Sequence, residues 1–508
     1  QIILLFFLFL FSSYCAVTIG QSWDERFHFL QGKITFDYLF SFGRLDKDIF
    51  YREFYSPMYW SIQYFLTQIF PSKYQIESSH LVNLIFSLGA IFAIKNVSKE
   101  LFNKKVSKIV FLVLFFYPIF FGQMGFNPKD TILTFCHVWI FYSILKYLKN
   151  QTNKYVANIG ILAAMGTGIQ LFFLGSLIPI FIFFICEIFI FKKIIYTNFD
   201  KKRFLYDLLK CFFIFYILLV LFWVDTHSNI FVLPFEFLMK TLSPGYTGVP
   251  FNLINENYYY STEIPKLYLF INFIYKSPEY FLITYILFAF LFINSKDFFI
   301  NKFELFNYKL LLLILILLYP NLILFFVPFP IYDGMRLFLW TLPYFCLIPG
   351  LTIYYLIDNL KFLKVKIIFV LLCLCFFYFF INFLIITPYQ YTYLNIFNGK
   401  KENRYQKFEN DYWGASLKEL INKSNLDFNK TIKFATCGTP VKIAKYYFKK
   451  KGNHNFRFVS PSDASYIIMT NRVTWNGNFI TCFDNFKGTN ISKVERNNLI
   501  LSVIRKID

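Results

Sequence analysis

Long apolar segments separated by short polar ones make up the first three quarters of the chain. A bilayer core needs about 20 apolar residues per helix, and eleven segments approach or reach that length. We predict membrane helices over residues 1–19, 78–94, 109–125, 131–148, 155–169, 171–191, 204–224, 279–294, 308–327, 337–357 and 365–386. The pattern predicts an α-helical polytopic membrane protein.

The first apolar segment has a second interpretation, as a cleaved signal peptide. No small-x-small cleavage motif precedes the acidic residues that follow it, so we favour a membrane helix. The sequence starts with Gln1 rather than Met, which leaves room for a longer natural N-terminus.

Basic residues are concentrated in alternate loops, and this predicts the orientation of the chain. Lysine and arginine gather in cytoplasmic loops of membrane proteins. The basic loops are residues 95–108, 146–154, 192–203, 296–309 and 361–366. We therefore expect a multi-pass protein of the cell (inner) membrane, with external loops over 20–77 and 226–278.

The segment SPMYWSIQYFLTQIF, residues 56–70, is apolar enough to be mistaken for a further span. If it crossed the membrane, the five lysines of 95–108 would fall outside. We therefore expect it to lie along the outer interface, where Trp and Tyr are favoured. A re-entrant hairpin is the alternative and leaves the sidedness unchanged.

The composition turns polar near Pro388, which predicts two domains: a membrane domain over 1–387 and a small external (periplasmic) α/β domain over 388–508. Alternating and β-rich patterns predict strands at 431–438, 456–460 and 464–471, with a closing hairpin around Asn497 and Asn498. The segment PVKIAKYYFKKK predicts a helix between the first two strands.

The composition supports a membrane protein and limits the kinds of partner that we expect. The chain is 57% apolar and only 16% charged, which exceeds the apolar content of soluble proteins. Its net charge is +21, and the C-terminal domain is basic, which favours an anionic membrane surface or ligand. We expect no nucleic acid partner, because no recognition motif is present.

The cysteine residues reveal little about the function of the protein. Seven of the nine lie in or beside apolar segments, where they act as small hydrophobic residues. Cys437 and Cys482 lie in the C-terminal domain and could pair in an oxidising compartment. No metal-ligand spacing and no phosphate-binding glycine motif is present.

Polar side chains recur at four external places, each with a simple structural explanation as a helix cap, a snorkelling cation or an aromatic belt. Taken together, carboxylates and cations on one face of a membrane domain indicate a site. The candidate residues are Asp24, Glu25 and His28 in QSWDERFHF, Asn127, Lys129 and Asp130 in FGQMGFNPKD, Glu263 in YYYSTEIPKLY, and Tyr332, Asp333 and Arg336 in PFPIYDGMRLF.

Transfer from a lipid-linked phosphate donor needs these residue types. The leaving lipid phosphate must be held and neutralised by Arg or Lys. The acceptor hydroxyl has a high pKa, so a carboxylate within hydrogen-bond reach must take its proton during attack. An Asp at the membrane surface can meet both groups.

The same motifs, with PYQYTYLNIFNG and FENDYWGASLKEL, resemble the GT-C superfamily of membrane glycosyltransferases over residues 20–470. The most similar branch holds the protein O-mannosyltransferases and lipid A aminoarabinose transferases. The resemblance implies an inverting transferase that takes a sugar from a polyprenyl phosphate. It implies that Asp24 is the general base, that Glu25 orients or contacts the acceptor, and that Lys129 and Arg336 face the donor phosphate. We expect His28 to pack in the loop.

The chain departs from this family at two places. Leu337 follows the Arg of the YDG motif where relatives often have His, so we expect no second donor there. The signature WWDYG of oligosaccharyltransferases is absent, and DYWG at residues 411–414 is interpreted as a junction between the two domains. We expect no cofactor, and no divalent metal, although the carboxylate pair leaves one possible.

Two other classes stay open at this point. A lipid-linked sugar transporter would need charges at mid-bilayer and repeated halves, and neither is visible here. A polysaccharide polymerase or ligase would also have many spans and a large external loop, but the folded C-terminal domain argues against it. The sugar is not determined by these residues, and the acceptor is left as a glycan, lipid or protein hydroxyl.

Overall fold

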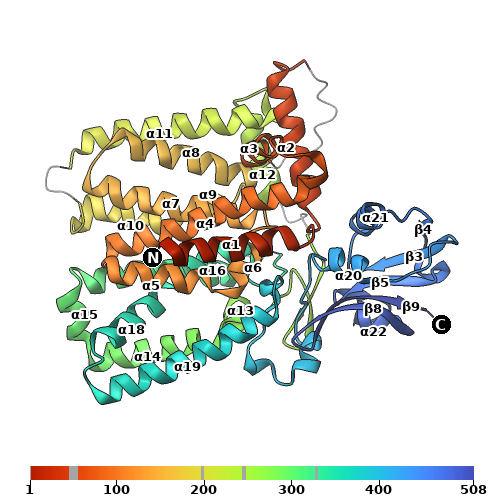
Figure 1. Cartoon of the computed structure of the whole chain (residues 1–508). Coiled ribbons are helices and arrows are strands. Elements are labelled where there is room, and N and C mark those ends of the chain that lie inside the picture. Colours follow the sequence, from red (N-terminus) through yellow and green to blue (C-terminus); the bar gives the residue numbers. More distant parts are fainter. Residues whose placement is uncertain (1, 45–54, 196–198, 243–247, 327–329, 508) are drawn as a thin grey trace.

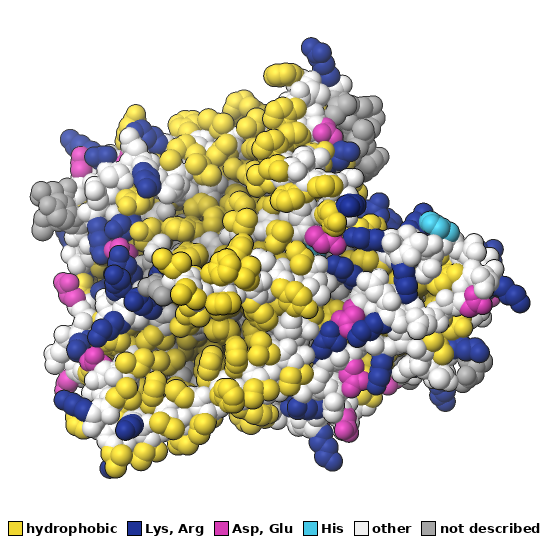
Figure 2. Space-filling model, in the orientation of Figure 1, with side chains coloured by type: hydrophobic (Ala, Val, Ile, Leu, Met, Phe, Trp, Pro, Cys, Tyr) yellow, Lys and Arg dark blue, Asp and Glu magenta, His cyan; other side chains and the backbone are white. Residues whose placement is uncertain are grey.

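The computed structural model describes residues 2–44, 55–195, 199–242, 248–326 and 330–507. Figure 1 shows a bundle of roughly parallel helices and, at one end of it, a smaller domain that contains a sheet. Figure 2 shows an apolar band across the bundle, with Lys and Arg side chains gathered at both ends of that band. This arrangement fits a membrane domain with a water-exposed domain attached.

All eleven predicted membrane segments fall on helices. The main bundle helices are α1 (Ile2–Thr18), α4 (Gln75–Leu101), α5 (Lys104–Phe115), α7 (Asp130–Lys149), α8 (Asn153–Ile169), α10 (Ile178–Cys186), α11 (Lys201–Phe222), α14 (Glu279–Asn294), α16 (Phe306–Phe326), α18 (Leu347–Asp358) and α19 (Leu363–Ile385). Shorter helices join them: α6 (Pro118–Gln123), α9 (Phe173–Ser176), α12 (Leu233–Leu242), α13 (Tyr268–Lys276), α15 (Lys296–Lys302) and α17 (Leu342–Phe345).

Fewer helices than the eleven predicted are long enough to cross a membrane. By length and composition, six of the described helices could cross a membrane, or seven if the bent pair α13 and α14 is one span. The predicted span 109–125 is divided between α5 and α6, where Pro118 starts a new helix. Proline lacks the amide hydrogen that would continue a helix. The predicted span 171–191 is likewise divided between α9 and α10.

The lysine-rich loops meet at one end of the bundle. Glu100 pairs with Lys146 at 3.2 Å and with Lys149 at 2.9 Å, which joins the first two of these loops. Lys302 pairs with Asp358 at 3.0 Å, which joins the loop 296–309 to the end of α18, just before the last of these loops. In Figure 1 this end, marked by α15, is opposite the C-terminal domain.

The other end of the bundle carries α2 (Glu25–Phe40) and α3 (Met58–Thr67), and α2 runs across the bundle axis there (Figure 1). The predicted interfacial segment 56–70 thus contains a helix of 10 residues, too short to span a bilayer. The two helices touch backbone to backbone, because a Cβ at Gly32 would lie 2.1 Å from the carbonyl oxygen of Trp60.

The C-terminal domain is a five-stranded sheet in the order β4-β3-β5-β9-β8. β3 (Ile432–Cys437) is parallel to β4 (Phe456–Phe458) and β5 (Tyr466–Thr470), while β9 (Leu499–Lys506) pairs antiparallel with β5 and with β8 (Thr489–Arg496). These strands and the helix α21 (Val441–Lys450) match the prediction. Two-stranded ribbons add β1 (Phe251–Ile254) with β2 (Asn257–Tyr260), and β6 (Val473–Trp475) with β7 (Phe479–Thr481).

Local chemistry explains two features of this domain. The β8–β9 hairpin turns at Asn497 and Asn498, whose φ values of 52° and 62° suit the asparagine-tolerant turn that joins two strands tightly. Cys437 and Cys482, whose pairing the sequence left open, form a disulfide between β3 and α22 (Cys482–Asn485), with Cα atoms 5.6 Å apart.

Backbone contacts hold the C-terminal domain on the first loop of the membrane domain. The Gly20 amide donates to the Ala415 carbonyl at 3.0 Å, beside α20 (Leu417–Lys423). The Gln21 amide donates to the Tyr447 hydroxyl of α21 at 2.7 Å. A Cβ at Gly20 would lie 2.4 Å from the Ala415 oxygen, so this approach requires glycine. The two domains therefore fix the chain immediately before Asp24.

Candidate functional site

Arg336 is the centre of a buried group of charges at the domain junction. Only 3% of its side chain is exposed. Its Nε donates to Asp130 Oδ2 at 2.9 Å and its Nη1 to Asp333 Oδ2 at 2.6 Å. Its Nη2 lies 4.0 Å from Asp24 Oδ2. These four residues, from three of the four predicted places, are called the Arg336 cluster below.

The start of α2 places Asp24 at the open side of this cluster. Asp24 is the N-cap residue of α2, yet its side chain makes no cap hydrogen bond. The side chain is 44% exposed, whereas the other members of the cluster are buried. Asp24 is therefore the carboxylate of the cluster that solvent and a substrate can reach.

Asn127 explains the position of Asp130. Its Oδ1 accepts the Asp130 amide at 2.9 Å and the Lys129 amide at 3.1 Å, while its Nδ2 donates to Asp130 Oδ2 at 3.0 Å. Asp130 is the first residue of α7, where a carboxylate is favoured by the helix dipole. Its Oδ1 is buried and has no hydrogen-bond partner among the described residues, so one acceptor in the cluster is unused there.

Asp333 joins Arg336 to a second arginine that the sequence did not suggest. Its Oδ1 accepts from Arg472 Nη1 at 2.6 Å, and Arg472 follows β5 in the C-terminal domain. Asp333 has φ 61° and Gly334 has φ 65°, so the chain makes a left-handed turn here. A Cβ at Gly334 would lie 2.7 Å from Lys276 Nζ, which places a further buried cation beside the turn.

Glu409 completes the buried charges on the C-terminal side. Its Oε2 lies 3.6 Å from Arg472 Nη1 and its Oε1 accepts the Val473 amide at 2.9 Å. Burial, with a smaller contribution from the charge of Asp333, raises the pKa of Glu409 to about 7, and Arg472 opposes this rise. Neither Glu409 nor Arg472 was predicted. In the sequence, Glu409 is marked only by its place just before an aromatic motif, and Arg472 only by its place just after a β-strand.

Aromatic rings enclose the cluster. The Arg336 guanidinium lies 4.2 Å from the ring centre of Trp413 and 5.5 Å from that of Tyr332. Trp413 belongs to the DYWG motif, so this motif lies at the domain junction as expected. Asp411 of the same motif is buried and accepts the amides of Ala415 and Ser416, each at 2.9 Å.

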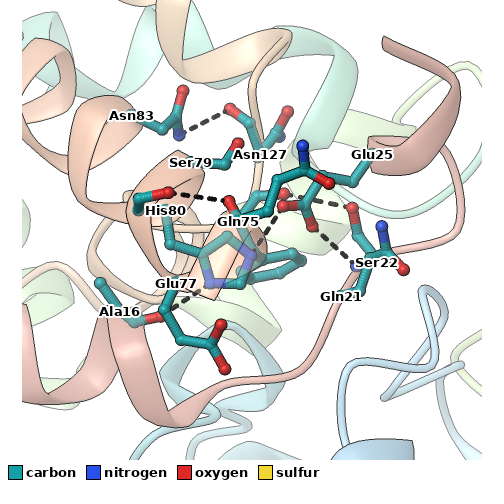
Figure 3. A network of polar contacts seen from close by, with 12 residues as sticks. Ala16, Gln21, Ser22, Glu25, Gln75, Glu77, Ser79, His80, Asn83 and Asn127 are labelled. Atoms are coloured by element: carbon teal, nitrogen blue, oxygen red, sulfur yellow. Dashed lines mark hydrogen bonds and ion pairs between the residues drawn. The ribbon is translucent and has the colours of Figure 1, made fainter. Parts of the chain in front are cut away.

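Glu25 does not point into the cluster with its neighbour Asp24. It is 3% exposed, and its Oε1 lies 2.8 Å from His80 Nε2 (Figure 3). Its Oε2 accepts the Ser22 amide at 3.1 Å, which holds the loop just before α2. His80 Nδ1 lies 2.7 Å from the Ala16 carbonyl, so both ring nitrogens face oxygen atoms.

These contacts favour orientation, rather than contact with an acceptor, as the role of Glu25. A carbonyl oxygen only accepts hydrogen bonds, so His80 Nδ1 is the donor to Ala16. His80 Nε2 is then the ring nitrogen that faces the Glu25 carboxylate. This pair ties α1, the first loop and α4 together next to Asp24. His80 was missed because it lies at the start of a predicted membrane helix.

The remaining candidates lie in three different settings. The Lys129 ammonium lies 5.6 Å from the ring centre of Tyr55, and no ion pair with the cluster is formed among the described residues. His28 is buried and stacks on Trp60 with ring centres 4.2 Å apart, which is the packing role we expected. Glu263 is exposed and makes no side-chain contact with the cluster in the described part of the chain.

A large cleft opens on the other side of Asp24. Its volume is about 1240 Å³, and it lies between the start of α2, residues 72–73 and α21. Asp24 therefore borders both the Arg336 cluster and the open cleft. Over the described ranges, no group of three or more His, Cys, Asp or Glu side chains is arranged to hold a metal ion.

Comparison with known proteins gives a partial family match and a shared fold. Residues 55–223 match the model of the family dolichyl-phosphate-mannose-protein mannosyltransferase. No curated protein matches the sequence.

Two solved structures share the fold over nearly the whole chain. ArnT from Cupriavidus metallidurans in the apo state has a TM-score of 0.54 at 9% identity and covers 99% of this chain and 97% of its own. ArnT from the same organism bound to undecaprenyl phosphate has a TM-score of 0.52 at 9% identity, with the same coverage.

A third structure, the apo oligosaccharyltransferase from Archaeoglobus fulgidus, has a TM-score of only 0.44 at 11% identity. It covers 91% of this chain and 69% of its own, and we draw nothing from it.

Over residues 55–223 the chain is similar to a mannosyltransferase family, and over nearly its whole length it shares the fold of ArnT. The ArnT-like fold includes both the helical bundle and the small C-terminal domain. The resemblance predicted from the motifs is thus confirmed: the chain resembles GT-C membrane glycosyltransferases of the protein O-mannosyltransferase and aminoarabinose transferase branch.

Proposed function

We propose that the protein is an inverting glycosyltransferase that moves a sugar from a polyprenyl-phosphate donor to an acceptor hydroxyl at the external face of the membrane. The observation that carries this proposal is the Arg336 cluster, which combines a fixed cation with one accessible carboxylate, Asp24. One of the two similar ArnT structures has undecaprenyl phosphate bound, which agrees with a donor of this class.

Arg336 is the proposed ligand of the donor phosphate. Two of its three carboxylate contacts are short and buried, while the third, to Asp24, is long at 4.0 Å. A donor phosphate would take the place of Asp24 at Nη2, because a hydrogen bond to a phosphate is stronger than a distant ion pair. Asp130 and Asp333 would keep the guanidinium in place during this exchange.

Asp24, once displaced from Arg336, is the proposed general base. It would accept the proton of the acceptor hydroxyl as the oxygen attacks the anomeric carbon. The bond between that carbon and the phosphate oxygen would break, and its electron pair would leave with the polyprenyl phosphate, held by Arg336. Attack opposite to the leaving group would invert the anomeric centre.

Lys129 and the sidedness of the site complete the proposal. Lys129 precedes Asp130 and is proposed to reach the donor phosphate after leaving the Tyr55 ring. The site lies at the end of the bundle away from the lysine-rich loops, which supports an external (periplasmic) location in the inner membrane. No cofactor is required by this mechanism.

Replacement of Asp24 tests the mechanism. Purified protein would be incubated with labelled polyprenyl-phosphate sugars and a membrane extract. We expect Asp24→Asn to lower transfer by about 10²–10⁴-fold, since it removes the base. Donor binding should persist, because Asn no longer competes for Arg336. Asp37→Asn on the same helix is the matched control and should keep full activity. Equal transfer by Asp24→Asn and wild type would reject the proposed base.

Labelling of engineered cysteines tests the sidedness. Arg26→Cys near the site and Lys104→Cys in a lysine-rich loop are both at exposed positions. A membrane-impermeant maleimide added to intact cells should modify the first variant only. Modification of the second variant alone would reverse the proposed orientation.

A further inference from the structure

The cleft beside Asp24 has a strongly basic lining that the proposed transfer does not yet use. Six cationic side chains line it, against the single carboxylate of Asp24: Arg26, Lys73, Lys442, Lys445, Lys449 and Lys450. All six are exposed. Of these, only Lys450 has an ion pair among the described residues, with Glu77 at 3.1 Å. The cleft therefore presents an excess of positive charge.

The sequence of α21 creates this charged surface. In VKIAKYYFKK, Lys442, Lys445 and Lys449 are spaced by three and four residues, which places them on one face of the helix. The opposite face buries Ala444 and Tyr447 in the core of the C-terminal domain. Such a helix is often just a solvated surface, but here its lysine face forms one wall of a cleft whose other wall holds Asp24.

The shape and lining of the cleft indicate what it binds. At about 1240 Å³ it is larger than the roughly 300–1,000 Å³ of most small-ligand pockets, so several sugar rings would fit. Trp23, Phe27 and Tyr446 line it together with the lysines, and Trp23 is 42% exposed. Aromatic faces and cations together suit a saccharide that carries negative charge.

The position of Asp24 assigns this cleft to one substrate. Asp24 lies 4.0 Å from Arg336 and also lines the cleft, which Arg336 does not line. A phosphate held by Arg336 and a hydroxyl in the cleft would therefore approach Asp24 from different directions. This is the arrangement needed for a base between donor and acceptor.

We propose that the cleft between α2 and α21 binds an anionic saccharide acceptor, with phosphate or carboxylate groups held by the lysine face of α21. This inference rests on the proposed transferase function, because it assigns the acceptor of the same reaction. It states that the acceptor is a glycan or the glycan headgroup of a lipid, and not a neutral sugar or a protein segment.

Binding measurements on the full-length protein in phosphatidylcholine nanodiscs test this inference without catalysis. The probe is a fluorescent heparin tetrasaccharide, compared with neutral cellotetraose. We expect wild type to prefer the heparin tetrasaccharide. The variant Lys442→Gln/Lys445→Gln/Lys449→Gln should weaken its binding about tenfold, as expected for three exposed charge contacts.

A matched triple variant controls for total charge. Lys430, Lys433 and Lys487 are exposed in the same domain and lie outside the cleft. Lys430→Gln/Lys433→Gln/Lys487→Gln should change the affinity less than twofold. An equal loss in both triple variants, or equal binding of cellotetraose, would overturn the inference.

Two further comparisons separate the other possible occupants. Binding of an oligoglutamate peptide of matched charge as tight as that of the tetrasaccharide would overturn the saccharide assignment in favour of an acidic protein. Loss of tetrasaccharide binding in nanodiscs that contain phosphatidylglycerol would overturn it in favour of a lipid surface, because the anionic lipid would then occupy the lysines.

The transfer assay keeps this inference separate from the function. Asp24→Asn should bind the tetrasaccharide at least as tightly as wild type does, because it removes the one negative charge that lines the cleft. Wild-type sugar transfer without charge-selective binding would reject the cleft as an anionic acceptor site and keep the transferase. Charge-selective binding by a wild type that transfers no sugar from any donor would reject the transferase, and with it the assignment of the bound saccharide as an acceptor.

Discussion

The two cationic regions on either side of Asp24 are built in opposite ways. The Arg336 cluster is buried, and both Arg336 and Arg472 are held by carboxylates at 2.6–2.9 Å. The lysine face of α21 is exposed, and Lys442, Lys445 and Lys449 have no ion pair within the described residues.

Positive charge can therefore serve two purposes in one site. A buried, paired guanidinium has a fixed position and is suited to stabilising a leaving phosphate. Exposed lysines attract a charged molecule over a longer range, and salt weakens that attraction.

The largest effect is expected from Asp333, which separates two buried arginines. Asp333→Asn would leave Arg336 and Arg472 without their shared carboxylate. Breaking a buried ion pair on one side costs about 3–5 kcal/mol, so the free energy of unfolding should fall by that amount. Denaturant unfolding in detergent would measure it. Lys445→Gln, on the exposed face of α21, should change the free energy of unfolding by about 0.5 kcal/mol or less. Equal losses in the two variants would mean that the buried and the exposed cations contribute equally to stability.

The second effect compares two conservative arginine substitutions. Arg336→Lys keeps the charge but cannot donate to Asp130, Asp333 and a phosphate at once. Transfer should fall about a hundredfold, as for the loss of a donor to a leaving oxygen. Arg26→Lys in the exposed cleft should lower transfer less than twofold. A similar loss of transfer in both variants would mean that the geometry of the cationic group matters equally in the Arg336 cluster and in the cleft.

The smallest effect concerns how the stability of the protein depends on pH through the buried carboxyl group of Glu409. The pKa of Glu409 is about 7 against an ordinary value of 4.5, so the folded protein holds more protons between these values. Stability should therefore fall as the pH rises from about 4.5 to 7 and stay lowered above that. Glu409→Gln should remove about 1–3 kcal/mol of this fall.

Thermal unfolding at pH 5 and pH 8 measures this dependence. At pH 5 the variant should resemble wild type, and at pH 8 it should be the more stable of the two. Glu402→Gln, at an exposed position before β3, is the matched control and should leave the profile unchanged. A profile that is the same in wild type and Glu409→Gln would contradict the role of burial.

The helices and the C-terminal strands could be predicted from the sequence because their signals are local. Long apolar runs specify membrane helices, and the Asn497 and Asn498 turn specifies its hairpin. Breaks within the helices were harder to predict. Pro118 divides a run whose hydropathy is continuous, and hydropathy averages over such a break.

The candidate site was predictable in its membrane part and not in the rest. Asp24, Asp130 and Arg336 stood out as charges at the ends of apolar segments, and the structure brings them together. Arg472 contacts Asp333 across 139 residues of chain, and no local pattern signals such a pair. His80 was hidden by its apolar surroundings, where a buried polar residue is the exception.

The contact between Gly20 and Ala415 has a consequence for any attempt to treat the protein as two modules. A domain exchanged for that of a relative would have to reproduce the same carbonyl, the Tyr447 hydroxyl and the Arg472 side chain to leave the reaction centre intact. Acceptor preference could therefore be changed by altering the exposed face of α21 within the resident domain, whereas grafting a whole foreign domain would disturb the chemistry along with the preference.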